Sequence, residues 1–427
     1  MSVVLRVGEH ELVEVGPAGL AEHELEYLIA LRDRGVRFFS EERIRGRWCC
    51  RFGGYVGAVL LPGGRTLEVL PKIAGLDDQG GRGLLMRMLS VADLAPALED
   101  APADYAGSST LIEAYLRFAA DLAVRQVRVG LVHAYRRLDQ RLPVVRGRLL
   151  VARQLARLPE RFDAHLVRAD EFVADTPVNR VIKAGVRWIA RCSRSDATVA
   201  KCREAVMRME AVADIPAEPR VLADAVRPWR SGAALDRQYM RLAPLLKLLG
   251  LLVGGRAAAP EAGVEALGPT LLFDMSELFE AVLAARLRAV APDVIVRAQG
   301  THAFDVGRRF RLRPDLVVEQ VGRPVMVLDA KWKRISGLSD IDDHDLRQAF
   351  AYARILGLDD AALVYPAMGG DTALSHSAEV ADGSGVRIHL RQVALAADGW
   401  THTDHALRGL LDERRGRSWF ASHAAVC

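Results

Sequence analysis

The stretch from Arg313 to Lys333 reads RPDLVVEQVGRPVMVLDAKWK, and it decides the fold of the C-terminal part of the chain. Two extended apolar runs flank a Val-Gly-Arg-Pro turn, a pattern that predicts a β-hairpin. A two-residue turn at Gly322-Arg323 would place Asp315 opposite residue 330, whereas a three-residue turn would place it opposite Asp329. In either register we expect the two aspartates to be cross-strand neighbours, with Cβ atoms roughly 5–8 Å apart.

Asp329 and Lys331 are two residues apart on the second strand, so their side chains share one face. Two carboxylates as close as Asp315 and Asp329 repel each other unless a cation lies between them, and hard oxygen ligands favour Mg²⁺ or Mn²⁺. Such a site can hydrolyse a phosphodiester, with Lys331 orienting the water and offsetting phosphate charge. The competing interpretation is an exposed hairpin with a simple ion pair. The agreement of hairpin, carboxylates and surrounding helices favours a metal-dependent nuclease.

This segment is similar to the PD-(D/E)xK nuclease superfamily, with Pro314-Asp315 as its PD and Asp329-Ala330-Lys331 as its D-x-K. The expected elements after residue 270 are a helix, several strands, a helix and a strand, and this order resembles that superfamily's α-β-β-β-α-β core. The resemblance implies a glutamate from the helix before the sheet, and Glu280 is the candidate. Glu277 is interpreted as part of a helix cap with Asp274, and both glutamates could instead be surface residues.

Gln348 and Tyr352 lie four residues apart on one face of the expected helix from 343 to 356. A Gln-x-x-x-Tyr pattern there resembles the RecB-like branch of the superfamily, which implies that both side chains line the site. The alternative is a polar stripe that faces solvent.

The motifs together resemble the McrC family, the nuclease subunit of McrBC modification-dependent restriction systems. Upstream segments are similar to family segments in the same order: TLEVLPKI at 66–73, VRGRLL at 145–150 and DTPVNR at 175–180. The resemblance implies a partner, a hexameric McrB-like AAA+ NTPase that typically uses GTP and is stimulated by the McrC chain. It also implies that an N-terminal finger-like part engages the hexamer's central channel, and that the partner recognises modified double-stranded DNA.

The composition agrees with a division of labour between two proteins. The 427 residues are 50% hydrophobic and 26% charged, with a net charge of +4, as in an ordinary globular protein. None of the six lysines follows a glycine, so the chain has no P-loop; the resemblance implies that the partner binds the GTP or ATP. Five cysteines without a C-x-x-C pair suit reduced thiols in the cytoplasm. Early charges argue against a signal peptide, and no segment suits a membrane span.

We expect a mixed α/β, multidomain chain. Residues 1–78 are predicted to form a β-rich region that binds the partner, and residues 79–253 a mainly helical region. Residues 254–269, rich in Gly, Ala and Pro, are predicted to be a linker, and residues 270–427 the PD-(D/E)xK nuclease domain. No motif fixes the residues that activate the partner. Arg146, Arg148, Asn179 and Arg180 are places to look, although Asn179 could be a helix cap and the arginines surface or ion-paired groups.

The predicted function is a Mg²⁺-dependent DNA endonuclease subunit that cuts when assembled with its NTPase. Asp315, Asp329 and Glu280 are the expected metal ligands, and Lys331, Gln348 and Tyr352 the supporting catalytic residues. One alternative is a scaffold that activates the NTPase and has a weak or silent nuclease site. Another is a stand-alone RecB-like exonuclease.

Overall fold

A computed structural model describes residues 4–17, 19–33, 38–73, 77–94, 110–157, 163–218, 221–222, 224–226, 240–254, 269–300, 302–303, 311–367, 373–395 and 399–424, with side chains up to residue 413. The chain forms two compact units, one made of Met1–Leu111 with Thr270–Cys427 and the other of Ile112–Pro269. Residues 1–111 therefore pack with the C-terminal part, a grouping that the four predicted segments did not anticipate. Most of the predicted linker, residues 255–268, lies outside the described residues.

The N-terminal part of the first unit is rich in strands, as its alternating apolar sequence predicts. One sheet has the order β1-β6-β5-β10 and a second has the order β2-β4-β3. The elements are β1 (Val4–Gly8), β2 (Leu12–Glu14), α1 (Glu22–Arg32), β3 (Phe39–Ile44), β4 (Arg47–Phe52), β5 (Tyr55–Leu60), η1 (Pro62–Gly64), β6 (Thr66–Leu70), α2 (Asp78–Val91) and β10 (Thr270–Asp274).

Strand β10 joins the two parts of the first unit, because it pairs antiparallel with β5 although more than 200 residues separate them in sequence. The close approach depends on Gly57, whose φ is +133° and whose absent Cβ would lie 1.8 Å from the carbonyl oxygen of Leu271. Only glycine fits such a position. Asp274 ends the strand and caps the next helix, because its side chain accepts hydrogen bonds from the amides of Ser276 and Glu277.

The C-terminal part is built on a six-stranded mixed sheet with the order β11-β14-β15-β16-β18-β17. Strands β15, β16 and β18 are parallel, while β11, β14 and β17 pair antiparallel with their neighbours. The elements are α9 (Met275–Val290), β11 (Ile295–Ala298), β12 (His302–Ala303), β13 (Arg311–Leu312), β14 (Leu316–Gln320), β15 (Arg323–Ala330), η4 (Leu338–Asp340), α10 (Asp343–Leu356), β16 (Asp360–Ala367), β17 (Ser375–Glu379), β18 (Arg387–Ala394) and α11 (Thr401–Ala424).

The predicted hairpin is present, but its turn is one residue earlier than the two-residue alternative. Val321 and Gly322 form the turn with positive φ angles of 50° and 74°, and Gln320 pairs with Arg323. A bulge after Val318 then shifts the register by one residue at Pro324, which has no N–H to donate to the ladder. The pairing therefore continues as Leu316 with Leu328, which brings residue 315 opposite residue 329.

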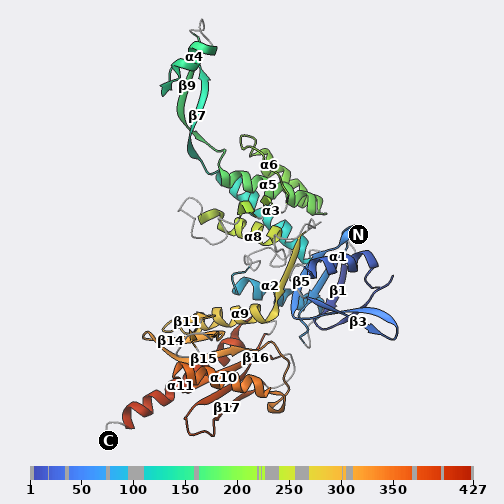
Figure 1. The fold of residues 1–427 in the computed structure, drawn as a ribbon, viewed down its shortest axis with the longest axis vertical. Coiled ribbons are helices and arrows are strands. Elements are labelled where there is room, and N and C mark those ends of the chain that lie inside the picture. Colours follow the sequence, from blue (N-terminus) through green and yellow to red (C-terminus); the bar gives the residue numbers. More distant parts are fainter. Residues whose placement is uncertain are drawn as a thin grey trace. The chain divides into compact units, whose positions relative to one another are not determined.

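Helices cover both faces of this sheet (Figure 1). Helix α10 packs on the face that carries Val317, Val327 and Leu363, within one apolar core. Helix α9 packs against β15 and against α11, and its Phe279 meets the ring of Trp332 edge-on at 5.4 Å. The even-numbered residues of β15 point toward α9, so the odd-numbered Asp329 points toward α10. The mixed α/β class predicted from the sequence is confirmed.

The second unit combines helices with an arm of β-structure. Its elements are α3 (Leu111–Val129), β7 (Ala134–Leu142), β8 (Arg148–Leu149), α4 (Val151–Arg157), β9 (His165–Val173), α5 (Pro177–Cys192), α6 (Asp196–Met207), η3 (Met240–Leu242) and α8 (Ala243–Gly254). Strands β7 and β9 pair antiparallel over nine residues, and α4 lies at the far end of this arm (Figure 1). We define the arm as the described residues of 134–173, a segment that the sequence did not predict to be β-structure.

Asn179 holds the base of the arm and is not a helix cap, so that interpretation is corrected. Thr176 caps α5 by accepting from the Asn179 amide. The buried Asn179 side chain donates to the carbonyls of Val132 and Ala174, at 2.8 and 2.7 Å, and so ties together the chain entering and leaving the arm. Arg180 pairs with Asp175 and is a structural ion pair. None of the helices in the described parts of the chain is both long and apolar enough to span a membrane.

Candidate active site

The carboxylates of Asp315 and Asp329 lie at the end of the β14–β15 hairpin that is farthest from its turn. Asp329 is 2% exposed, and the register puts Asp315 opposite it. One oxygen of Asp315 accepts a hydrogen bond from the Ala330 amide at 2.8 Å. Burial, and then the negative charge of Asp329, raise the pKa of Asp315 to about 7. The two carboxylates therefore repel each other, and a bound cation would reduce this repulsion.

Lys331 lies directly beside the pair. Its ammonium is 2.5 Å from Asp329 Oδ2 and donates to Gln348 Oε1 at 2.9 Å. Burial alone would lower the pKa of Lys331, but the adjacent Asp329 carboxylate reverses this effect and raises it. The lysine is therefore charged at neutral pH and is aimed at the carboxylates.

Gln348 and Tyr352 extend this contact along one face of α10. Gln348 Nε2 donates to Tyr352 Oη at 2.7 Å, and Tyr352 is only 5% exposed. The tyrosine hydroxyl in turn donates to the Arg313 carbonyl at 3.4 Å, next to the start of β14. Hydrogen bonds thus connect Lys331, through Gln348 and Tyr352, to the Arg313 carbonyl. The two α10 side chains therefore do not form a polar stripe that faces solvent.

Glu280 projects from α9 toward the same end of the sheet. It is 8% exposed and accepts a hydrogen bond from Gln299 Nε2 at 3.1 Å. Burial raises its pKa, and the charge of Asp329 adds a smaller rise in the same direction. Gln299 has a φ of +52° and is held on its other side by the guanidinium of Arg313. No sequence pattern predicts a role for Gln299, because its position in the site depends on a turn between β11 and β12.

Asp345 is a further residue that the sequence reasoning missed. It lies in the first turn of α10, is 2% exposed, and accepts a hydrogen bond from Lys333 Nζ at 2.9 Å. Tyr365 Oη donates to the same oxygen at 3.4 Å, and the other oxygen of Asp345 is 3.7 Å from Lys331 Nζ. Asp345 thus lies between the two lysines of the D-x-K-x-K segment. Its spacing of three residues before Gln348 was the available signal.

The donor set suits a divalent cation only in part. Among the described residues, no group of three or more His, Cys, Asp and Glu side chains is close enough to hold a metal ion, so Glu280 does not complete a three-carboxylate cage. Mg²⁺, however, is commonly bound by one or two carboxylates together with waters and substrate phosphates. The repelling Asp315–Asp329 pair fits that mode, and Lys331 provides its positive counter-charge in this structure.

The raised pKa of Asp315 predicts a stabilising substitution. Because the folded pKa of about 7 exceeds the ordinary 3.8, the carboxyl's contribution to stability is fully present below pH 3.8 and is lost as pH rises through 7. Asp315→Asn removes the ionisation that causes this loss of stability. The amide oxygen of the new side chain can still accept the hydrogen bond from the Ala330 amide. We expect Asp315→Asn to match the wild type near pH 4. At pH 8 in EDTA it should be more stable by roughly 1–2 kcal/mol, less than the full shift because the side chain is partly exposed.

Thermal unfolding at the two pH values measures this difference, with the exposed Asp343→Asn on α10 as the matched control. An Asp315→Asn variant that is destabilised at pH 8 relative to pH 4 would contradict the assignment.

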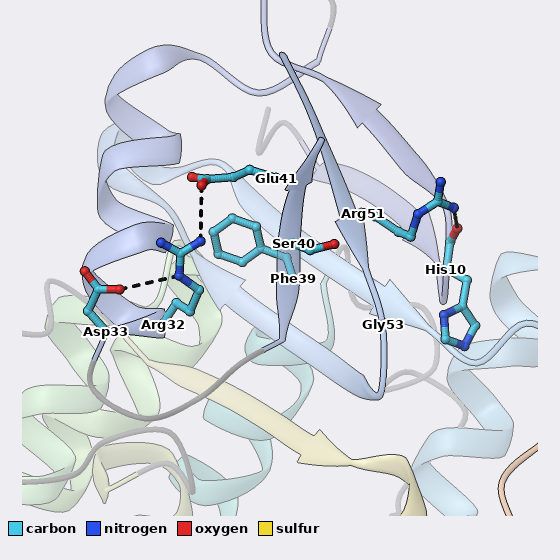
Figure 2. Close-up of a pocket in the computed structure, with 8 residues that line it drawn as sticks. All are labelled: His10, Arg32, Asp33, Phe39, Ser40, Glu41, Arg51 and Gly53. Carbon is cyan, nitrogen blue, oxygen red and sulfur yellow. Dashed lines mark hydrogen bonds and ion pairs between the residues drawn. The ribbon is translucent and has the colours of Figure 1, made fainter. Parts of the chain in front are cut away.

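A separate pocket of about 880 Å³ lies in the N-terminal part (Figure 2). It is lined by His10, Arg32, Asp33, Phe39, Ser40, Glu41, Arg51 and Gly53. Its charged groups are paired: Arg32 contacts Glu41 and Asp33, and Arg51 pairs with Glu42 and donates to the His10 carbonyl. None of the carboxylates or lysines of the candidate site lines it, so the pocket is not where we place the chemistry.

Comparison with known proteins identifies the family of the chain. The sequence profile of the family described as "McrBC 5-methylcytosine restriction system component" matches residues 50–366. A chain of the refined half-complex from the tetradecameric assembly of Thermococcus gammatolerans McrB AAA+ hexamers with bound McrC is 17% identical, with a TM-score of 0.74 over 96% of this chain and 100% of that chain. No curated protein sequence matches.

A second solved structure, the cryo-EM structure of the Thermococcus gammatolerans McrBC complex, contains a chain that is 17% identical, with a TM-score of 0.52 over 67% of this chain and 88% of that chain. The fold is thus one that occurs in restriction complexes. Since the family profile covers more than half of the sequence, the chain belongs to the McrBC family of restriction system components.

Proposed function

We propose that this McrBC family member is a Mg²⁺-dependent DNA endonuclease subunit, whose C-terminal part is a PD-(D/E)xK nuclease domain. The observation that carries the proposal is the pair of half-buried Asp315 and buried Asp329, with the Lys331 ammonium 2.5 Å from Asp329. Paired carboxylates beside a lysine, at the end of a hairpin strand between two helices, match the chemistry needed to cleave a phosphodiester.

The residues divide the work by position. Asp315 and Asp329 would hold the cation, which when bound lowers the pKa of a water and offsets charge on the phosphate. Lys331, kept charged by Asp329, can donate a hydrogen bond to the attacking water or to a phosphate oxygen. Gln348 orients the ammonium, and Tyr352 fixes Gln348. Glu280 faces the site from α9, where it can accept a proton or bind a water in the cation's outer shell.

We further propose that the chain works with a hexameric AAA+ NTPase. The related solved chain comes from an assembly of McrB AAA+ hexamers with bound McrC, and this sequence has no P-loop of its own. GTP or ATP would be bound by the partner, which would also select modified double-stranded DNA. Residues 1–78 were the predicted partner-binding region. The arm is a better candidate, because its end exposes Val144, Val145 and Leu155, at 64%, 55% and 64% of their surface.

The test is reconstitution of the purified chain with its AAA+ partner on methylated and unmethylated DNA. We expect cleavage of modified DNA only with Mg²⁺, nucleotide triphosphate and both proteins present. Absence of cleavage together with stimulated NTP hydrolysis would favour the scaffold alternative. DNA degradation by the chain alone, without nucleotide, would favour the stand-alone exonuclease.

The arm yields a separate prediction. Because Val144 and Val145 are exposed, replacing both with aspartate should leave the thermal stability of the chain near the wild-type value. If they are central contacts, stimulation of NTP hydrolysis should fall at least about 10-fold. Val129→Asp, at an equally exposed apolar residue at the end of α3, is the control. Unchanged stimulation by the double variant would exclude the end of the arm as the contact.

A further inference from the structure

Glu9, the residue that follows β1, is buried and contacts a side chain of the C-terminal part. It is 2% exposed, and both of its carboxylate oxygens accept from the indole Nε1 of Trp332, at 3.0 and 3.1 Å. The two residues are separated by 323 positions in sequence. The only titratable side chain that is ion-paired with it in the described residues is His10, at 3.6 Å.

Trp332 occupies a position from which it can control the candidate active site. It directly follows Lys331, and its ring packs edge-on against Phe279 of α9, which directly precedes Glu280. The Lys331 amide is still part of the sheet, since it donates to the Val364 carbonyl at 2.9 Å, whereas β15 ends at Ala330. Beyond this bond, the chain after Lys331 is held by the indole contacts and by the hydrogen bond of Lys333 Nζ with Asp345.

The Glu9 contact is poorly explained as a contribution to stability alone. Burying a carboxylate costs several kcal/mol, and the indole N–H, the Gly54 backbone and His10 together return only part of that cost. Burial accordingly raises the pKa of Glu9, and the hydrogen bond from Trp332 only moderates the rise. An apolar residue would fill the same space without this penalty, but it could not fix the orientation of the indole. The Glu9 carboxylate therefore serves to fix the orientation of the Trp332 indole.

We propose that Glu9 is a positioning residue for the nuclease site, holding the indole of Trp332 so that Lys331 stays aimed at Asp329. This inference rests on the proposed function. It assigns the start of the chain to the nuclease apparatus, together with the β10–β5 pairing and the hydrogen bond from the Met275 amide to the Gly54 carbonyl at 2.9 Å. His10, which lines the pocket, lies 3.6 Å from the Glu9 carboxylate, so a change in the position of His10 would also affect the Glu9–Trp332 hydrogen bonds.

The test compares Glu9→Gln and Glu9→Ala in the reconstituted complex, with the exposed Glu14→Gln as control. Glutamine still offers an oxygen to the indole, so Glu9→Gln should keep kcat within about 3-fold of wild type. Glu9→Ala should lower kcat about 10–100-fold with the KM for DNA unchanged. Hydrogen exchange of the amides from 328 to 333 should speed up in Glu9→Ala only. The emission of Trp332, isolated by subtracting that of Trp332→Phe, should change in Glu9→Ala.

The proposal is overturned if Glu9→Ala cuts as fast as wild type, or if Glu9→Gln loses as much kcat as Glu9→Ala. It also fails if exchange at 328–333 stays the same while the variant is folded. If the wild-type complex does not cut DNA at all, the proposed function fails. Exchange and emission then still decide whether Glu9 holds the strand end.

Discussion

Replacing Asp329 with alanine is expected to abolish DNA cleavage by the reconstituted complex. Asp329 is the most buried member of the carboxylate pair and the direct ion-pair partner of Lys331. Its loss removes one of the two proposed cation ligands and the carboxylate that holds the Lys331 ammonium in the site. We expect a fall of at least about 1,000-fold in the cleavage rate, equivalent to about 4 kcal/mol of transition-state stabilisation.

The same variant should still stimulate NTP hydrolysis, because the arm belongs to the other compact unit. Asp343→Ala is the matched control: it removes an exposed aspartate from the first turn of α10, where the carboxylate pairs only with the exposed Arg347. Circular dichroism and thermal unfolding check that each variant is folded. An Asp329→Ala complex that cuts within tenfold of wild type would remove Asp329 from the proposed mechanism.

The largest effect on stability is expected at Glu68, in the N-terminal sheet. This glutamate is fully buried on β6 and accepts from Arg82 of α2 at 2.6 Å, from Arg6 of β1 at 3.4 Å and from the Leu111 amide. Glu68→Ala would remove the Glu68 carboxylate from beside the guanidinium of Arg82, itself 7% exposed. Breaking a buried pair from one side costs about 3–5 kcal/mol, a large share of the roughly 5–15 kcal/mol that stabilises a typical protein.

Chemical denaturation measures the loss, with Glu42→Ala as the control, since Glu42 pairs with Arg51 at the surface and should contribute far less. The double variant Glu68→Gln with Arg82→Met should recover much of the stability, because it removes the buried positive charge together with the carboxylate. If Glu68→Ala costs no more than Glu42→Ala, the buried cluster does not stabilise the fold in this way.

The hairpin and its D-x-K segment could be predicted from the sequence because their signals are local. Period-two alternation places Asp329 and Lys331 on one face, and a turn between two apolar runs brings Asp315 back across. The register was left open between two alternatives. It depends on a positive φ at Val321 and on a bulge beside Pro324, and neither is favoured by the residue types alone. The structure reaches the 315–329 pairing by combining a short turn with that bulge.

Other features could not be predicted because their signal is weak or distant. The arm has polar side chains on both faces of β7, so its sequence lacks the apolar alternation that identifies a strand. Asp345 and Gln299 become part of the site only through contacts between elements. The Glu9–Trp332 bond joins residues that no local pattern relates. Long-range pairing of polar groups is where single-sequence reasoning has least information.

The pairing of β10 with β5 has a consequence for how the chain is assembled. Leu111 is bonded to Glu68 on β6, Thr270 is paired with Val59 on β5, and β5 and β6 are neighbours in one sheet. The second unit is thus an insertion into the first unit. The residues at its two ends, Leu111 and Thr270, contact the adjacent strands β6 and β5. Such an insertion can become longer or shorter, or be replaced, while the sheet β1-β6-β5-β10 keeps its strand pairing. The second unit and the candidate active site of the first unit can therefore change independently in evolution.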